Sequence, residues 1–311
     1  MGRKKAALSG QLSDVDLRLL RVFKTVADAG GFSAAELKLN LANSTISNHI
    51  SDLESRLDMR LCDRGRSGFN LTEQGVRVYS AIQELLNAVD QFRNSVNETH
   101  NTIIGTLELG FAEHLPWSQD DGLINALTSM SSVAPDVYLN IKTMGSDDIV
   151  SAVLNRQVDL GITVLPFNYP DLASLPIFEE SMLLYCGLGH PLFQQAVNSI
   201  EQLSTYRFVE SPRLMQGREI YPEVAHWQKT AKAHHQEART ALILTGHYLG
   251  FLPEHLVKGT PLENHLKPIL VEQLGYKNIF YAIWRKATAE QIVLDTFIQC
   301  LKQTCHPNLS P

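Results

Sequence analysis

The chain has 311 residues, of which 44% are hydrophobic and 19% charged, a composition typical of a folded globular protein and not of a disordered one. Its length suits two or three domains, and it has no apolar run of about 18 residues, which excludes a membrane-spanning helix. The net charge of −6 is uneven: residues 1–70 hold 11 Lys or Arg against 8 Asp or Glu, and the remainder holds 16 against 25. A basic head on an acidic body suggests that only the head meets a polyanion.

The N-terminus and the cysteines together indicate a cytoplasmic protein. The chain starts MGRKKAALSG, which is positively charged but is not followed by the apolar core of a signal peptide, so we do not expect export. The four cysteines are scattered along the chain, as in proteins of a reducing compartment. We expect residues 1–12 to form a flexible N-terminal arm.

Residues 13–72 predict a winged helix-turn-helix domain. Ser13 and Asp16 resemble a capping box at the start of the first helix, and Gly30-Gly31 ends it. We expect helices over 13–28, 33–39 and 43–57, with Ser33 capping the second, and short strands over 60–64 and 69–71. The turn between the strands, residues 65–68, is tight and basic. Three helices followed by a basic hairpin within about 60 residues are typical of DNA-binding proteins.

Residues 73–100 predict one long linker helix. It has no proline or glycine between Val76 and His100, and its apolar residues recur every three or four positions. A lone helix of this length must bury its apolar stripe, either against a second copy of the chain or against its own domains. We expect dimerisation, through the stripe formed by Tyr79, Ile82, Leu86 and Val89.

Residues 105–305 alternate between strands and helices. Strands are expected at 107–111, 137–141 and 158–164, with helices near 123–130 and 147–156. Repeated strand-helix-strand units predict an α/β domain with a mostly parallel sheet. A second set of elements begins near residue 166, and the tail from 279 returns to the first set. We therefore expect two lobes: lobe I from about 105–165 and 268–305, and lobe II from about 166–267.

Asp16–Gly75 closely resembles the DNA-binding region of LysR-type transcriptional regulators. The residues that carry the resemblance are Phe23, Ala27, Phe32, Ala34-Ala35, Leu39, Ser47, Ile50, Leu53-Glu54, Leu57, Leu61, Arg64, Leu71-Thr72-Glu73 and Gly75. Looser matches follow at Asp159–Ile162, His190–Leu192 and Gly250–Pro253. The family usually has a serine cap before its recognition helix, where this chain has Ala42, so Asn43 or Ser44 is expected to cap instead. The resemblance implies a multi-domain α+β protein: a winged helix-turn-helix, a linker helix and a periplasmic-binding-protein-like effector domain.

Within this framework, polar side chains on the third helix are candidates for reading base edges in the major groove: Asn43, Ser44, Thr45, Asn48 and His49. Ser33, Arg64 and Arg66 are candidates for holding phosphates, through a helix N-terminus and a basic wing. The alternative for each is an ordinary solvated surface residue.

An effector is expected between the two lobes, at the carboxyl ends of the strands. The candidates are Phe111, Glu113, His114, Gly145, Ser146, Asp147 and Thr163 from lobe I, and Ser211, His247 and Phe251 from lobe II. Gly145-Ser146 precedes a helix, which predicts an anion site, whereas Glu113 favours an amine. An effector with both charges, such as an amino acid, reconciles the two features.

The expected function is transcription regulation by a small polar effector, with promoter DNA and a second copy of the chain as partners. A homotetramer and contact with RNA polymerase follow only from the family resemblance. The alternatives are a solute-binding protein without a DNA role, and an enzyme, for which no nucleophile, phosphate-loop or metal motif is present. The eleven histidines form no ligand motif, so we expect no metal and no cofactor.

Overall fold

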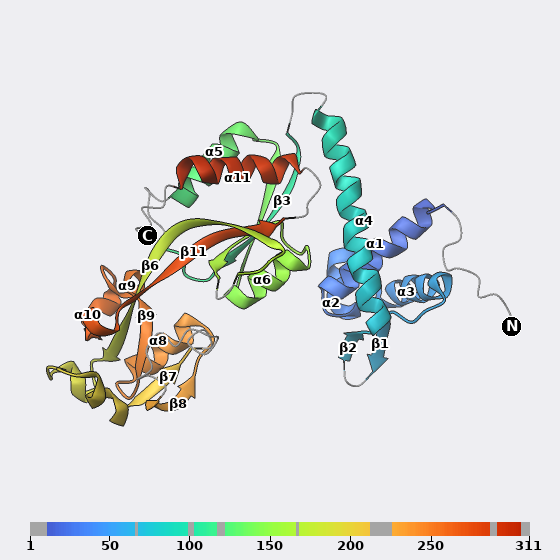
Figure 1. Ribbon diagram of the computed structural model, residues 1–311. Coiled ribbons are helices and arrows are strands. Elements are labelled where there is room, and N and C mark those ends of the chain that lie inside the picture. Colours follow the sequence, from blue (N-terminus) through green and yellow to red (C-terminus); the bar gives the residue numbers. More distant parts are fainter. Residues whose placement is uncertain are drawn as a thin grey trace. The chain divides into compact units, whose positions relative to one another are not determined.

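A computed structural model describes residues 11–65, 68–98, 103–116, 122–165, 168–211, 226–286 and 291–305 (Figure 1). The chain divides into two compact units, Met1–Val96 and Asn97–Pro311. Among the described residues, no helix is both long and apolar enough to cross a membrane. The expected N-terminal arm falls almost entirely on residues outside these ranges.

The N-terminal unit consists of helices α1 (Asp14–Asp28), α2 (Phe32–Leu39) and α3 (Asn43–Leu57), the antiparallel strands β1 (Cys62–Gly65) and β2 (Gly68–Leu71), and helix α4 (Glu73–Glu98). Helix α1 begins with the expected capping box, in which Ser13 and Asp16 hydrogen-bond each other's backbone N–H. Its apolar face contributes Leu19, Phe23 and Val26 to the core of the unit. Three helices and a hairpin therefore share one hydrophobic centre.

The starts of α2 and α3 differ from the expectation. Gly31, at φ 151°, is the N-cap of α2, so Ser33 lies inside the first turn and does not cap it. Ala42 is the N-cap of α3 and offers no side-chain acceptor, and neither Asn43 nor Ser44 replaces it. Instead the carboxylate of Glu36, on α2, accepts a hydrogen bond from the backbone N–H of Asn43. The cap of α3 is thus supplied by the preceding helix, which links the two helices of the motif.

Helix α4 packs against the core of its own unit. Ile82 is only 2% exposed in that core, and Tyr79 and Leu86 pack around it. The Tyr79 hydroxyl also donates a hydrogen bond to Asp28 of α1. Of the residues expected in a dimer seam, Ile82 is therefore covered by its own unit, which is the alternative that the sequence left open, while Tyr79 and Leu86 are half-buried. Further along the helix, Val89 is half-buried and Phe92 is 69% exposed.

The C-terminal unit is built on one continuous nine-stranded sheet. Its strands are β3 (Gly105–Ala112), β4 (Val137–Met144), β5 (Leu160–Val164), β6 (Leu172–Gly187), β7 (Arg207–Glu210), β8 (Gln228–Lys232), β9 (Leu249–Pro253), β10 (Leu266–Ile269) and β11 (Tyr276–Arg285). They run in the order β4-β3-β5-β11-β6-β9-β7-β8, and β10 pairs with β6. Pairing is parallel among β3, β4 and β5 and among β7, β8 and β9, but β6 and β11 run antiparallel to their neighbours. The sheet is mixed, and the expectation of a mostly parallel sheet was wrong.

Two lobes lie at either end of this sheet. Lobe I contains β3, β4 and β5 with helices α5 (Gly122–Val133), α6 (Ser146–Leu154) and α11 (Ile292–Thr304); α5 and α11 lie side by side on one sheet face and α6 lies on the other (Figure 1). Lobe II contains β7 to β10 with α8 (Gln236–Leu244), α9 (Glu254–Val257) and α10 (Val271–Leu274). Strands β6 and β11 run through both lobes and form the connection between them.

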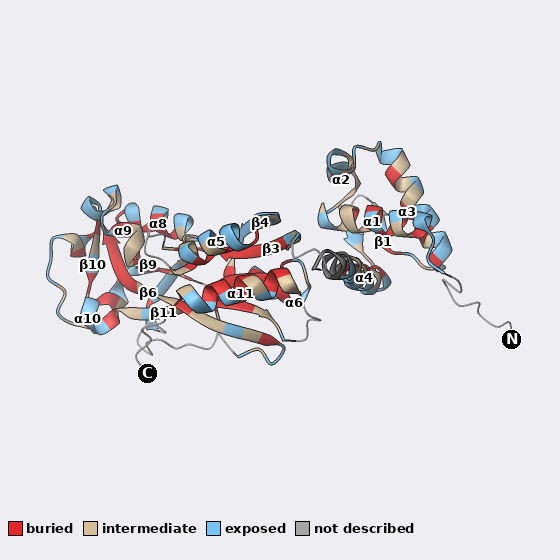
Figure 2. Cartoon of the chain, turned by 90° about the horizontal axis from the view of Figure 1, so that it is seen from above, coloured by how far each residue is buried: buried red, intermediate tan, exposed pale blue. Residues whose placement is uncertain are grey.

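Each lobe has its own apolar centre. In lobe I, α11 buries one side, including Phe297, Ile298 and Leu301, against α5 and the sheet, while its opposite side is exposed (Figure 2). Lobe II has two smaller clusters, one on each face of its strands, around Phe208 and around Ile243. Among the described residues the shared strands are the only sheet connection, so the position of one lobe relative to the other depends on β6, β11 and on side-chain contacts across the lobes.

Candidate DNA-binding surface and inter-lobe face

Helix α3 has one buried face and one polar face. Ile46, Ile50, Leu53 and Leu57 repeat every three or four residues and are all buried. This leaves Asn43, Ser44 and Asn48 exposed, with Thr45 and His49 half-buried at the border. The Ser33 hydroxyl of α2 lies 3.5 Å from the Asn43 amide nitrogen, so the first turns of both helices form one polar surface.

Polar contacts fix α3 relative to the hairpin and to α1. The Glu54 carboxylate accepts hydrogen bonds from the backbone N–H groups of Leu61 and Cys62, at 2.7 and 3.3 Å, immediately before and at the start of β1. Arg56 forms an ion pair of 2.9 Å with Asp16. Hydrogen bonds from Ser13, aided by Arg56, lower the pKa of the Asp16 carboxyl. The polar face of α3 is therefore held on a rigid support.

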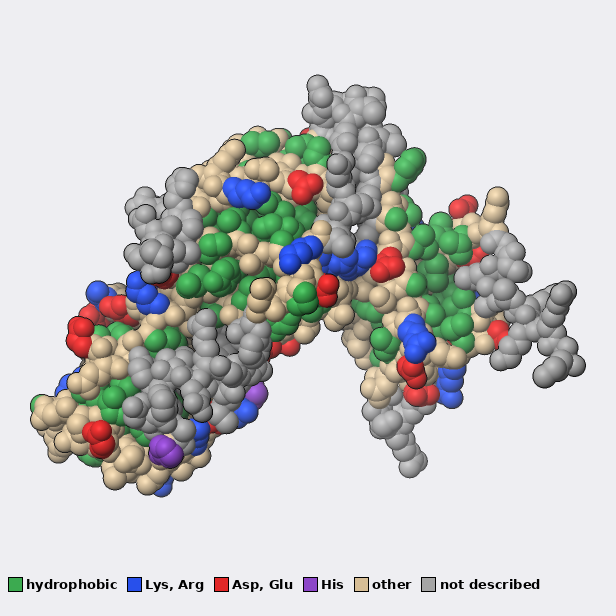
Figure 3. Space-filling view, viewed as in Figure 1, with side chains coloured by type: hydrophobic (Ala, Val, Ile, Leu, Met, Phe, Trp, Pro, Cys, Tyr) green, Lys and Arg blue, Asp and Glu red, His purple; other side chains and the backbone are tan. Residues whose placement is uncertain are grey.

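The wing is described through its backbone. Arg64 pairs in register with Phe69, and the Phe69 ring meets Phe32 of α2 edge-on, with ring centres 5.8 Å apart. Arg66 and the Arg64 side chain lie outside the described residues. On the face shown in Figure 3, the Lys and Arg side chains of the described residues occur in small separate groups and do not form one basic area.

In lobe I, the start of α6 lies beside the end of β5. Gly145 is the N-cap, and Ser146, the first helical residue, is 7% exposed. The buried Ser146 hydroxyl has no hydrogen-bond partner among the described residues. The Thr163 hydroxyl, fully buried, approaches the Ser146 carbonyl at 3.4 Å. Asp147 is exposed in the first turn of the helix. Ser146 and Thr163, both predicted for the effector site, thus lie close together.

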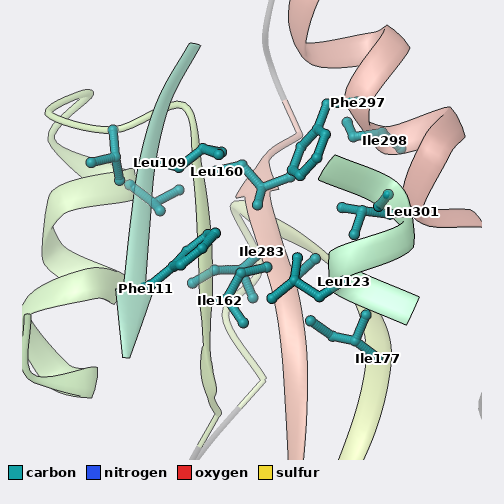
Figure 4. Packing of buried hydrophobic residues seen from close by; sticks show 14 of the residues in the cluster. Leu109, Phe111, Leu123, Leu160, Ile162, Ile177, Ile283, Phe297, Ile298 and Leu301 are labelled. Carbon is teal, nitrogen blue, oxygen red and sulfur yellow. The ribbon is translucent and has the colours of Figure 1, made fainter. Parts of the chain in front are cut away.

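Two sequence candidates lie in the apolar cores of the lobes. Phe111 is buried in the lobe I core, among Ile162, Ile283 and their neighbours (Figure 4). Phe251 is buried in the lobe II core, where it meets the rings of Phe208 and Tyr276. Their positions in the strands place both side chains inside, and we remove them from the effector site.

His247 is also misplaced by the sequence reasoning. It precedes β9, which runs antiparallel to β6 from Leu249, opposite Cys186, to Pro253, opposite Met182. His247 therefore lies at the end of β9 that is remote from lobe I. Burial, and to a smaller degree the charge of His247, lower the pKa of His190, which lies just beyond β6.

In lobe II, the first turn of α8 carries a buried arginine. Arg239 is 5% exposed and donates hydrogen bonds of 3.0 Å to the Phe251 carbonyl and to the Ser211 hydroxyl. Ser211 directly follows β7, so the guanidinium links the carboxyl end of β7 to the middle of β9. Sequence reasoning found Ser211 but missed Arg239, because an arginine inside a helix usually indicates a solvated face.

The loop after β3 meets α8 across the two lobes. Glu113 Oε2 lies 2.7 Å from Nδ1 of His235, the N-cap of α8, and His114 Nε2 lies 2.7 Å from Glu237 Oε1. We call the surface formed by Glu113 and His114 after β3, the start of α6, the start of α8 and Ser211 the inter-lobe face. Glu113 and His114 were predicted here, whereas His235 and Glu237 were missed, because pairing between residues over 120 positions apart leaves no local pattern.

Among the described residues, no cluster of three or more His, Cys, Asp or Glu side chains has an arrangement that would hold a metal ion. All four cysteines are buried as free thiols. Burial raises the pKa of the Cys186 thiol to about 11, which disfavours the reactive thiolate.

Comparisons with known proteins agree over nearly the whole chain. Residues 17–76 match the family model described as "Bacterial regulatory helix-turn-helix protein, lysR family", and residues 100–306 match "LysR substrate binding domain". The transcriptional activator BauR of Pseudomonas aeruginosa is 36% identical over 304 residues, covering 97% of this chain and 99% of that protein. The transcriptional regulator GltR of Bacillus subtilis is 29% identical over 195 residues, covering 61% and 62%.

Solved structures show the same fold. A full-length OxyR variant from Pseudomonas aeruginosa superposes with a TM-score of 0.62 at 17% identity, covering 97% of this chain and 100% of that one. Full-length CbnR in complex with its target DNA superposes with a TM-score of 0.59 at 17% identity, covering 93% and 99%.

Proposed function

The chain belongs to the LysR family of transcription regulators, and we propose on this premise that α3 reads promoter DNA while a small acidic effector binds at the inter-lobe face. LysR-type proteins are DNA-binding regulators modulated by an effector, not enzymes. Nothing in the comparisons favours a solute-binding protein, which would have no use for the helix-turn-helix unit.

The polar face of α3 is the observation that carries the DNA-binding proposal. Its residues Asn43, Ser44, Thr45, Asn48 and His49 present short hydrogen-bonding groups of the kind that fit base edges. Ser33 shares this surface and is proposed to hold a phosphate near the start of α2. Arg64 and Arg66 are proposed to hold the neighbouring backbone from the wing. CbnR, which has this fold, has been solved with its target DNA.

A gel shift with the full chain tests this function. The probe is the DNA upstream of the chain's own gene, and the competitor is random DNA of the same length. We expect a complex that survives a large excess of competitor, since specific sites are typically bound 10³- to 10⁷-fold more tightly than nonspecific DNA. Equal competition by the two DNAs would rule out sequence-specific regulation through this region.

The start of α6 supports an acid group on the effector. A buried hydroxyl without a partner is unfavourable by about 1–3 kcal/mol, so Ser146 is suited to donate to a ligand. The backbone N–H groups of the first turn add partial positive charge, and the buried guanidinium of Arg239 adds a full charge from lobe II. Asp147 and Asp148 offset part of this charge, and Glu113, which His235 holds at 2.7 Å, lies on the same face. Gly145, His114, Thr163 and Ser211 complete the proposed site.

The oligomer is proposed to form beyond the first half of α4. Ile82 is buried in the core of its own unit, whereas Val89 and Phe92 keep apolar surface accessible. We propose a homodimer through this end of α4, with a homotetramer and contact with RNA polymerase as properties expected of the family. In this arrangement 13–72 is the DNA-binding domain, 73–100 the linker and 105–305 the effector-binding domain.

A further inference from the structure

Histidine and glutamate side chains cross between the lobes at two adjacent points. Glu113 of lobe I faces His235 of lobe II at 2.7 Å, and His114 of lobe I faces Glu237 of lobe II at 2.7 Å. Each lobe therefore supplies one acid and one base, and the two contacts form a reciprocal pair. Both lie on the inter-lobe face, beside the start of α6.

A third histidine connects this pair to the strand that joins the lobes. His255, on α9, lies with Nε2 3.0 Å from the carbonyl oxygen of His114 and with Nδ1 3.8 Å from the carboxylate of Glu180 on β6. Glu180 also accepts a hydrogen bond from Asn278, its register partner on β11. His114 has a left-handed backbone, φ 54°, which an L-residue adopts only at a cost. The loop is thus held against lobe II by its backbone as well as by its side chains.

We propose that Glu113 and His235, beside the His114–Glu237 contact, form a protonation-controlled clasp. The clasp holds the lobes closed over the effector site when His235 is charged and releases them when His235 loses its proton. This inference rests on the proposed function, because it assigns regulation to the site at which the effector is proposed to bind. The effector-binding domain would then respond to pH as well as to the effector.

The carboxylates around His235 give the direction of the pH response. His235 faces carboxylates from three elements: Glu113 on the β3 loop, Glu237 on α8 and Asp148 on α6. The hydrogen bond and charge of Glu113 contribute most, and together these groups raise the pKa of His235. The helix start and the contact with His114 lower the pKa of Glu237. Because the pKa of His235 is raised in the closed form, closure is favoured at pH values below the usual histidine pKa. This preference is lost as the pH rises through the raised pKa of His235.

His255 has the opposite role. Burial, and to a smaller degree the charge of His114, lower its pKa, so it stays neutral near pH 7 and donates Nε2–H to the His114 carbonyl. Its environment comprises Glu180 on β6 and His114 on the β3 loop. His255 thus positions the loop and does not titrate with the clasp.

The clasp should shift the equilibrium of the lobes toward the closed form without making closure complete. The His235 side chain is 56% exposed, and exposed ion pairs are screened by water and salt. Pairs of this kind change an equilibrium constant by about two- to fivefold. A bias of that size is enough to alter the apparent affinity of an effector that binds the closed form.

Single-molecule energy transfer within the full chain tests the clasp. The four native cysteines are buried, so dyes can be directed to Ser132→Cys on α5 and Glu272→Cys on α10, one exposed position in each lobe. Mixing labelled chain with a large excess of unlabelled chain keeps one labelled copy in each particle. We expect the ratio of closed to open molecules to fall about two- to fivefold between pH 6 and pH 8.5, and to fall likewise when salt is raised at pH 6.

Three variants make the result specific. Glu113→Gln and His235→Asn each remove one charge, and both should make the ratio nearly independent of pH; near-ultraviolet circular dichroism checks that they fold. His234→Asn, at the exposed neighbouring histidine, should keep the wild-type profile. Nuclear magnetic resonance of the histidine rings should show a lower His235 pKa in Glu113→Gln.

A flat wild-type profile, or a full pH response in both charge-removing variants, would overturn the clasp. The gel shift separates this outcome from failure of the proposed function, because the clasp can fail while specific DNA binding persists.

Discussion

Thr45 lies where α3 passes from its buried to its exposed face, so its methyl and hydroxyl groups can meet a base edge without disturbing the core. We expect Thr45→Ala to weaken binding to the cognate site by about 1–3 kcal/mol and to leave binding to random DNA unchanged. Thr25→Ala on α1, where the hydroxyl bonds the Arg21 carbonyl, is the matched control. Gel-shift titrations on both DNAs measure the difference, and equal losses on the two would exclude base reading by Thr45.

Ser146 offers a test in which stability and binding move in opposite directions. Removing its buried, unpartnered hydroxyl should leave the melting temperature unchanged or raise it. If the hydroxyl binds an acidic effector, Ser146→Ala should weaken the binding of that effector by roughly ten- to a hundredfold, which is the contribution of a hydrogen bond to a charged group. Ser151→Ala, on the same helix with its hydroxyl bonded to Asp147, is the control.

Calorimetry with small acids, amines and amino acids provides the measurement for Ser146. A ligand that alters DNA binding yet binds Ser146→Ala as tightly as wild type would show that the acid group is held elsewhere.

Asp159 should make the stability of the C-terminal unit depend on pH. Burial, with a smaller contribution from the charge of Glu108, raises its pKa from 3.8 to about 6, while the Glu108 N–H opposes the shift. A carboxyl whose pKa is higher in the folded state stabilises the fold at pH values below its pKa in the unfolded state. This contribution disappears as the pH rises through its pKa in the folded state. We expect unfolding free energy to fall by up to roughly 3 kcal/mol between pH 4 and pH 7 from this group.

Asp159→Asn should remove that pH-dependent component, whereas the exposed control Asp136→Asn should not. Urea unfolding followed by tryptophan fluorescence measures it, because all three tryptophans lie in the C-terminal unit. An unchanged pH profile in Asp159→Asn would show that Asp159 is already ionised at pH 4.

At the scale of a single element, the first half of α4 is expected to stabilise the N-terminal unit and its second half to mediate self-association. Ile82→Asp would bury an unpaired charge in the core, so the N-terminal unit should lose several kcal/mol or fail to fold. Phe92→Asp changes an exposed position and should leave the helical circular dichroism and its melting curve intact while weakening self-association. Sedimentation at micromolar concentration measures the particle mass. A Phe92→Asp variant with wild-type mass and DNA binding would place the dimer seam elsewhere.

At the scale of the whole molecule, the uneven charge should confine salt-sensitive DNA binding to the N-terminal unit. Each phosphate contact contributes about one unit to the slope of log affinity against log salt. Arg66→Ala on the wing should therefore flatten the slope by roughly one unit and weaken binding on all sequences alike. Lys302→Ala, an exposed cation on α11, should leave the slope unchanged. An unaltered slope in Arg66→Ala would mean that the wing does not hold a phosphate.

The sequence by itself determined the elements whose signals are local. The capping box at Ser13, the apolar spacing of α3 and the motifs of the N-terminal region identified the helix-turn-helix unit and the family. Ser146 and Thr163 could be brought together because the ends of parallel strands meet at one sheet edge.

Only the tertiary structure decided the features that depend on distant partners. Glu36 caps α3 from another helix, and Ile82 is buried by its own unit. His235 contacts Glu113, which is 122 positions away in the sequence. The mixed sheet arises because β11 returns antiparallel between β5 and β6. Phe111 and Phe251 are buried in the lobe cores, and the antiparallel pairing of β9 with β6 places His247 at the end of β9 remote from lobe I. Sequence periodicity reports which residues share a face of one element, but which surface covers that face is fixed only when the elements pack.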